Sequence, residues 1–77
     1  MEKDLIEYIA KSLVDSPSAV EVNIIEGEKS TMMELKVATK DIGKVIGRHG
    51  RIAKAIRTIL QAATMRLGKR TMLEILD

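Results

Sequence analysis

Residues 41–56 decide the fold of this chain, and they read DIGKVIGRHGRIAKAI. Apolar residues over 41–46 share one side of a helix of little more than one turn. Two glycines, Gly47 and Gly50, then interrupt the helical pattern, and apolar residues resume at three- and four-residue steps after Arg51. The stretch therefore predicts a short helix, a four-residue turn and a much longer helix.

The turn Gly47-Arg48-His49-Gly50 has the chemistry of an anion-binding loop. Glycine adopts backbone angles closed to other residues, and its lack of Cβ lets a phosphate approach the main chain. The first amides of the following helix have no partners inside that helix, and its dipole end is positive. A simpler interpretation is a tight corner whose glycines serve only the bend. The flanking cations favour the anion-binding interpretation, and they are Lys44, Arg48, Arg51 and Lys54.

The segments on either side of this stretch complete an α+β domain. Residues 2–15 show the spacing of an amphipathic helix, and Val20, Val22 and Ile24 alternate with polar residues as in a half-buried strand. Residues 33–37 and 70–76 predict two further strands, and the glycine-containing link between the first two strands predicts an antiparallel hairpin. The element order is α-β-β-α-α-β. A crossover through two helices joins parallel strands, so we expect a mixed three-stranded sheet with the helices packed on one face in two layers.

Angles around the long helix predict which side faces the core. At about 100° per residue from Arg51, Lys54 lies near 300° and Arg57 near 240°. Arg57 therefore points away from the predicted core, which supports RNA contact by this residue only weakly. The apolar side spans roughly 80–180° and holds Ile52, Ile56, Ile59, Leu60, Ala63 and Leu67.

Composition and charge limit the class of protein. The 77 residues fit one domain, with no cysteine for a disulfide or a thiolate metal site, and no long apolar run for a membrane span. We therefore expect one domain over residues 1–77 and a cytoplasmic location. Residues 1–34 carry a net charge of −5 and residues 35–73 a net charge of +9. Six bases between Lys40 and Arg57 surround the glycine pair, a pattern typical of nucleic-acid binding.

The segment from Val45 to Ile52 resembles the Ile-Gly-x-x-Gly-x-x-Ile signature of KH domains. The element order is similar to their type II form, and the whole chain resembles the small bacterial single-KH proteins of the KhpA family. This resemblance implies a GXXG loop that clamps the backbone of about four nucleotides beside an apolar groove. It also implies dimers, formed with a second copy or with a larger KH-containing protein.

The resemblance assigns roles to individual residues. It makes Gly47 and Gly50 the close-approach positions and Arg48 and His49 the pair that touches phosphate or sugar. His49 lacks a second histidine or a cysteine for a metal site, so we interpret it as a phosphate-facing donor. The helical wall of the groove would be lined by Ile42, Val45 and Ile46, with Leu35 or Val37 near the floor, although each of these residues could equally be core. Basic contacts would come from Arg51, Lys54, Lys44 and Lys40.

The outward faces of the predicted strands carry more apolar side chains than a solvated face requires. These are Ile25, Met32, Met72 and Leu76. Self-association or a protein partner could cover them.

Together these features predict a non-enzymatic protein that binds single-stranded RNA with low sequence specificity. An RNA chaperone or a post-transcriptional regulator would have these properties. No Walker motif, paired carboxylates near the glycines or metal-ligand cluster suggests catalysis or a small-molecule substrate, and we expect no cofactor. The alternative is a protein-interaction module with a KH fold and little intrinsic RNA binding.

Overall fold

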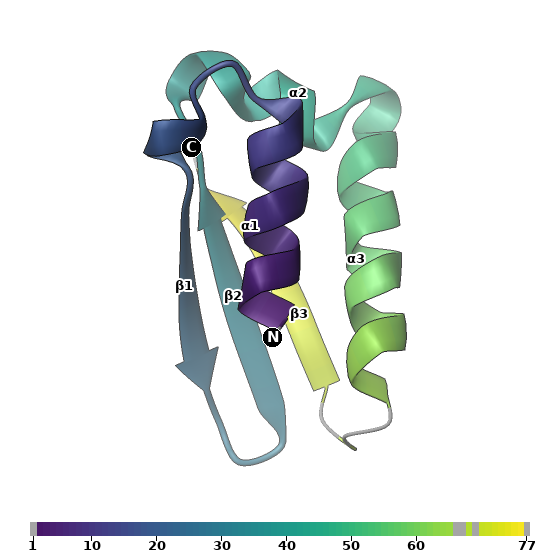
Figure 1. Ribbon diagram of the computed structural model, residues 1–77. Helices are drawn as coiled ribbons and strands as arrows, with labels where there is room; N and C mark the ends of the chain where they lie inside the picture. The colour runs from purple at the N-terminus through teal and green to yellow at the C-terminus, as the bar shows by residue number, and fades with distance from the viewer. Residues whose placement is uncertain (1, 66–67, 69, 77) are drawn as a thin grey trace.

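The computed structural model describes residues 2–65, 68 and 70–76, and their element order is the predicted one (Figure 1). The helices and strands are α1 (Glu2–Leu13), β1 (Glu21–Glu26), β2 (Ser30–Lys36), α2 (Ile42–Ile46), α3 (Arg51–Thr64) and β3 (Arg70–Leu76). Short 3-10 turns occur at η1 (Pro17–Ala19), η2 (Thr39–Asp41) and η3 (Arg48–Gly50). The first helix ends two residues earlier than its apolar pattern predicts.

The sheet has the order β1-β2-β3 and is mixed, as predicted. β1 pairs with β2 in antiparallel sense, with Val22 opposite Leu35, and β2 pairs with β3 in parallel sense, with Met33 opposite Leu73. Figure 1 shows α1 and α3 side by side over one face of the sheet, and α2 at the end of the sheet where the chain passes from β2 to α3. The α+β, two-layer architecture of a type II KH domain is therefore confirmed.

A single core fills the space between the two layers. Leu35 on the central strand and Leu60 on α3 are almost completely buried, and burial of such a side chain stabilises the fold by about 2 kcal/mol. The buried apolar residues come from all six main elements described and from two adjoining segments. They are Ile6, Ala10, Val14, Val20, Val22, Met33, Leu35, Val37, Val45, Ala53, Ile56, Leu60 and Leu73.

The buried side of α3 is rotated from the predicted one. Ile59 is 47% exposed and Ala63 is exposed, so the prediction that both lie in the core was wrong. The buried positions are Ala53, Ile56, Leu60 and Thr64. A prediction from apolar residues alone misses this buried side of α3, because Thr64 is polar. The Thr64 hydroxyl nevertheless donates a hydrogen bond to the Leu60 carbonyl at 3.0 Å, so it can be buried in the core without an unpaired polar group. Leu67 lies outside the described residues.

The predicted alternation of β1 holds only for its first half. Val20 and Val22 are buried, whereas Ile24 is 40% exposed. Figure 1 shows the β1–β2 hairpin extending beyond the start of α1, so no described helix covers its tip. Met33, which pairs with Ile24 on the central strand, is buried, so the helical layer does reach this level of the sheet. Ile24 is exposed because β1 is an edge strand that the helices cover less fully there.

Candidate nucleic-acid interface

The loop between α2 and α3 has the left-handed backbone that its glycines predict. Gly47 has φ 77° and ψ 173°, His49 has φ 58° and ψ 24°, and Gly50 has φ 74° and ψ 14°. Non-glycine residues adopt positive φ at a cost of about 1–2 kcal/mol. The strained His49 is thus held in place by the turns on either side of it.

The two glycines have different surroundings. A Cβ on Gly47 would lie 2.5 Å from Cγ1 of Ile52, whereas a Cβ on Gly50 would meet nothing within 4 Å. Gly47 is therefore required by the packing of the chain against itself. Gly50 faces open space, so only its positive φ, or an approaching ligand, gives a reason for glycine there.

The loop presents backbone donors. The Gly50 amide donates to the Gly47 carbonyl at 3.1 Å, and the Arg51 amide donates to the Arg48 carbonyl. In the described part of the chain, the amides of Arg48 and His49 donate to no acceptor. Two free N–H groups in a glycine turn at the positive end of α3 form a suitable cradle for an anion.

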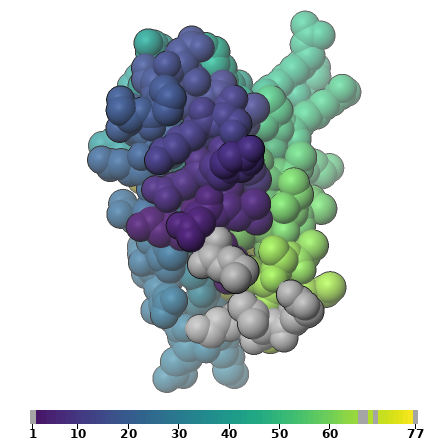
Figure 2. Space-filling view, viewed as in Figure 1, coloured from purple at the N-terminus to yellow at the C-terminus, as the bar shows by residue number. Residues whose placement is uncertain are grey.

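Exposed basic side chains surround this cradle. Arg48 and His49 are exposed on the loop, and Arg51 and Lys54 are exposed on the first two turns of α3. Lys40 is exposed in η2, before α2. In Figure 2, side chains of the teal segment that contains the loop project from the upper right of the molecule. The structure therefore brings these five residues to the end of the domain that α2 and α3 share.

Lys44 has a different environment from the other bases. Its Nζ forms an ion pair with Asp15 and lies 3.6 Å from Oδ1 of Asp41. The hydrogen bond to Asp15, opposed by partial burial, raises the pKa of Lys44 above its usual value. These carboxylates neutralise the Lys44 charge, which ties α2 to the segment after α1.

Asp41 is the buried end of this ion-pair network. Its carboxylate has no contact with solvent, and Oδ2 accepts a hydrogen bond from the Ser16 amide at 3.1 Å. Burial raises the pKa of Asp41, but hydrogen bonds from the Asp15 and Ser16 backbone and the charges of Lys44 and Lys40 outweigh burial, so the pKa lies below its usual value. Asp41 therefore fixes the start of α2, and with it the position of the loop.

The apolar residues assigned to the groove are divided between surface and core. Ile42 and Ile46 are half-buried on α2, where they can offer a wall to a base. Val45 is 0% exposed, and Leu35 and Val37 are also buried. These three support the site from inside the core and do not line its surface.

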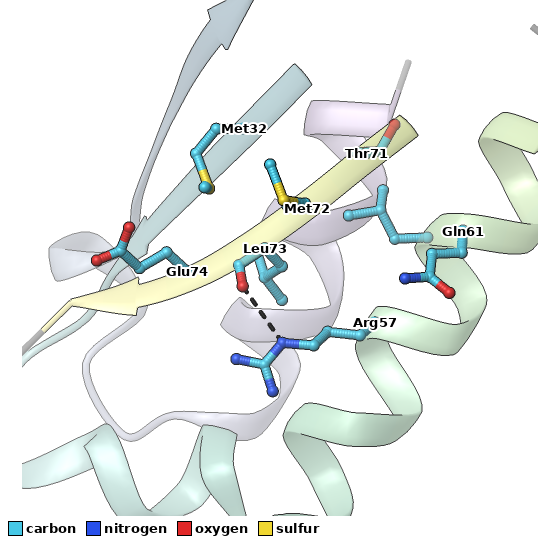
Figure 3. Close-up of a pocket in the computed structure, with 8 residues that line it drawn as sticks. Met32, Arg57, Gln61, Thr71, Met72, Leu73 and Glu74 are labelled. Carbon is cyan, nitrogen blue, oxygen red and sulfur yellow. Dashed lines mark hydrogen bonds between the residues drawn. The ribbon is translucent and has the colours of Figure 1, made fainter. Parts of the chain in front are cut away.

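The helix angles taken from the apolar pattern predict that Arg57 points away from the core. In the structure Arg57 lies closer to the sheet, because the buried side of α3 is rotated toward it. Its Nε donates to the Leu73 carbonyl at 3.2 Å, across the gap between α3 and β3 (Figure 3). The terminal guanidinium nitrogens have no hydrogen-bond partner within the described residues. Arg57 continues the line of Arg51 and Lys54 along α3, about 9 Å from the helix start. If the buried Thr64 is counted as a core position, the predicted core face of α3 turns toward Arg57 and places this residue near the sheet.

A cavity of about 370 Å³ opens along the free edge of β3. It shares Arg57 with the basic line on α3 but contains no residue of the loop. Its lining residues are Met32, Arg57, Leu60, Gln61, Thr71, Met72, Leu73 and Glu74.

The described residues hold neither a membrane-spanning helix nor a metal-binding cluster. Across residues 2–65, 68 and 70–76, no helix has the length and apolar character needed to cross a membrane. The same residues contain no group of three or more histidine, cysteine, aspartate or glutamate side chains that could hold a metal ion.

Solved structures with the same fold include two of the protein Era. The chain aligns with Aquifex aeolicus Era bound to GDP and aluminium fluoride with a TM-score of 0.69 and 21% identity, over 96% of this chain and 29% of that one. An Era complex with a nucleotide and a segment of 16S ribosomal RNA aligns with a TM-score of 0.64 and 22% identity, over 96% and 28%. The chain thus spans less than a third of either Era structure, and the likeness establishes the fold alone.

Sequence relatives are much closer. The chain is 58% identical over 76 residues to RNA-binding protein KhpA of Borreliella burgdorferi, covering 99% of this chain and 93% of the relative. It is 57% identical over 74 residues to RNA-binding protein KhpA of Clostridium acetobutylicum, covering 96% and 99%. The family model for the KhpA/KhpB KH domain matches residues 3–75. The chain therefore belongs to the KhpA/KhpB KH-domain family.

Proposed function

We propose that this protein binds single-stranded RNA at the loop Gly47-Arg48-His49-Gly50. The observation that carries the proposal is the loop itself, in which two unpartnered amides and two exposed basic side chains surround a glycine with open space above it. The names of the curated relatives support the same function, because they are RNA-binding proteins.

RNA would contact two surfaces in this arrangement. A phosphate would sit on the amides of Arg48 and His49, while Arg51 and Lys54 contact the phosphates that follow, and Lys40 approaches from the side of α2. Bases would lie against the half-buried wall that Ile42 and Ile46 offer. Lys44 would contribute less than the other bases, because Asp15 and Asp41 already neutralise its charge.

The small size of this surface sets its specificity. A loop that holds about four nucleotides cannot specify a long site, so the protein would bind many transcripts with a loose sequence preference. A non-enzymatic role as an RNA chaperone or post-transcriptional regulator in the cytoplasm fits this property. Residues 1–77 would act as one KH domain. Its protein partner would be a second copy of the chain or a larger KH-containing protein.

The experiment is a titration with a short mixed-sequence single-stranded RNA at two salt concentrations. Wild-type protein should bind with log K falling against log[salt] at a slope of about −2 for three phosphate contacts. The variant Arg48→Asp/His49→Asp should lose binding while keeping its circular dichroism spectrum. The control Lys29→Asp/Asn23→Asp makes the same change in charge on the hairpin and strand, at two exposed positions away from the loop, and should bind almost normally.

Equal losses in the two variants would mean that only net charge matters and that the loop is not the site. No binding by wild type at low salt would favour the alternative function, a protein-interaction module with little intrinsic RNA binding.

A further inference from the structure

The cavity between α3 and the free edge of β3 has the properties of a small ligand site. Among the residues that line it, Leu60 and Leu73 are buried and apolar, whereas Arg57 and Gln61 are exposed and polar. Its volume of about 370 Å³ lies at the low end of the range found for pockets that hold small molecules. The cavity can therefore accept a flat group that is apolar on its faces and polar at its edge, such as a nucleobase.

Arg57 is held in one orientation beside this cavity. Its Nε donates to the Leu73 carbonyl at 3.2 Å, and this bond fixes the guanidinium plane against β3 (Figure 3). Unpaired RNA bases stack on guanidinium planes as well as on aromatic rings. The single aromatic side chain of the sequence is Tyr8, on α1, so α3 has no aromatic ring for this purpose. A fixed Arg57 guanidinium is the stacking platform that this surface offers.

Two further polar side chains at the cavity lack hydrogen-bond partners. Gln61 lies one helical turn after Arg57, and Figure 3 shows both side chains reaching from α3 toward β3. The Gln61 amide carries donors and an acceptor, and none of them is paired within the described residues. Thr71 is only 4% exposed, yet its hydroxyl has no partner among the same residues. Buried polar groups are normally paired, so a ligand with a hydrogen-bonding edge suits this place.

The cavity also continues the cationic surface that begins at the loop. Arg51, Lys54 and Arg57 follow one another at three-residue steps along α3, and all three are exposed. At 1.5 Å per residue, Arg57 lies about 9 Å along the helix from Arg51. Cations in such a line follow the backbone of a single strand. They connect the loop, where RNA would first bind, to the cavity.

We propose that the cavity binds one further nucleobase of the strand that the loop holds, outside the group of about four nucleotides at the loop itself. The base stacks on the Arg57 guanidinium, and its polar edge bonds to the Gln61 amide. The phosphate that precedes it lies near Lys54. This inference rests on the proposed function, because the loop supplies the first contact with the RNA.

The structure favours a base over an extended peptide at this edge. A peptide that adds a strand to a sheet pairs with the free amides and carbonyls of the edge strand. Arg57 already occupies the Leu73 carbonyl in the middle of that edge. The cations along α3 also match the phosphates of an RNA strand.

The test compares a tetranucleotide with an octanucleotide, both of mixed sequence, in NMR titrations of the full chain. The tetranucleotide occupies the loop alone, whereas the octanucleotide extends from the loop to the cavity whichever of its ends the loop holds. The octanucleotide should bind wild-type protein more tightly and shift the amides of residues 71–74, which the tetranucleotide should leave in place. The ratio of the two affinities measures the contribution of the cavity.

Arg57→Lys should reduce this ratio about tenfold, because lysine keeps the charge but has no plane on which a base stacks. Gln61→Leu should reduce it about threefold through loss of the hydrogen bonds to the base edge. The matched control is Arg70→Lys, which makes the same exchange at an exposed position of β3 that does not line this cavity. It should leave the ratio unchanged.

Urea denaturation of each variant checks folding. Gln61→Leu keeps the test valid if Arg57→Lys unfolds, because Gln61 is exposed and its side chain has no partner in the described part of the chain. A ratio that is the same in wild type, Arg57→Lys and Gln61→Leu would overturn the cavity proposal and leave the loop as the RNA site. If neither RNA binds wild-type protein at low salt, the proposed function fails together with the cavity proposal.

Discussion

The two glycines of the loop should respond very differently to alanine. Gly47→Ala forces a Cβ to within 2.5 Å of Ile52 at φ 77° and ψ 173°, a region that essentially only glycine occupies. The backbone strain costs about 1–3 kcal/mol, and displacement of the half-buried Ile52 adds about 1–3 kcal/mol. Gly47→Ala should therefore lower the free energy of unfolding by about 4 kcal/mol, a large share of the stability of a small domain.

Gly50→Ala meets no atom within 4 Å, so its cost is the left-handed backbone alone. That cost is about 1–2 kcal/mol, reduced by about 0.4–1 kcal/mol because alanine also restricts the unfolded chain. The net loss should be about 1 kcal/mol, and the variant should stay folded. Its RNA affinity should nevertheless fall, because the new methyl group occupies the space through which a phosphate would approach.

The assay is urea denaturation followed by circular dichroism, together with the RNA titration. Gly43→Ala is the matched control, since Gly43 lies in α2 with no atom within 4 Å of an added Cβ and should gain about 0.5–1 kcal/mol of stability. Equal losses for Gly47→Ala and Gly50→Ala would refute the packing argument. Unchanged RNA affinity in Gly50→Ala would show that no phosphate approaches that position closely.

Four further predictions follow from the same structure. The pKa of Asp41 is lower in the folded protein than its usual value of 3.8, so the ionised carboxylate stabilises the fold above pH 3.8. This stabilisation is lost as the pH falls through the folded-state pKa. Asp41→Asn should therefore lower the melting temperature more at pH 7 than at pH 2.5. Leu60→Ala should cost about 3 kcal/mol in urea denaturation while Ile59→Ala costs under about 1 kcal/mol, and similar losses would contradict the observed face of α3. His49→Gly relieves about 1–2 kcal/mol of strain, partly offset because glycine frees the unfolded chain, so it should raise stability by a net ~0.5 kcal/mol and with it the melting temperature, yet weaken RNA binding. A lower melting temperature would argue against strain. Arg57→Lys removes the Nε donor to the Leu73 carbonyl and should cost about 1 kcal/mol, with faster amide exchange around Leu73 in the middle of β3 as the measurement that checks it.

Local patterns in the sequence were enough to predict the fold and the loop. Apolar periodicity identified the helices and strands, because a helix and a strand repeat at different steps and each buries one face. The crossover between two strands then required a mixed sheet. The glycine pair located the turn, since only glycine adopts φ near +77° and ψ near 173° without strain.

Side-chain burial at the edges of the domain was predicted less well. Ile24 and Ile59 are as apolar as their buried neighbours, but Ile24 lies on the edge strand β1 and Ile59 lies on a side of α3 that no described element fully covers. Thr64 is polar and buried, because its hydroxyl bonds to a carbonyl of its own helix. Periodicity shows that a face exists, but it does not show how far the opposite layer extends.

The sequence by itself thus determined the order of elements, the sheet type and the position of the basic loop, all of which depend on residues close together in the chain. Only the tertiary structure decided which charges remain available. Lys44 meets Asp15 across 29 positions, and Arg57 meets Leu73 across 16. The structure also placed Met32 beside Met72. Such partners lie far apart in sequence, and no local pattern encodes their meeting, because it depends on how whole elements pack.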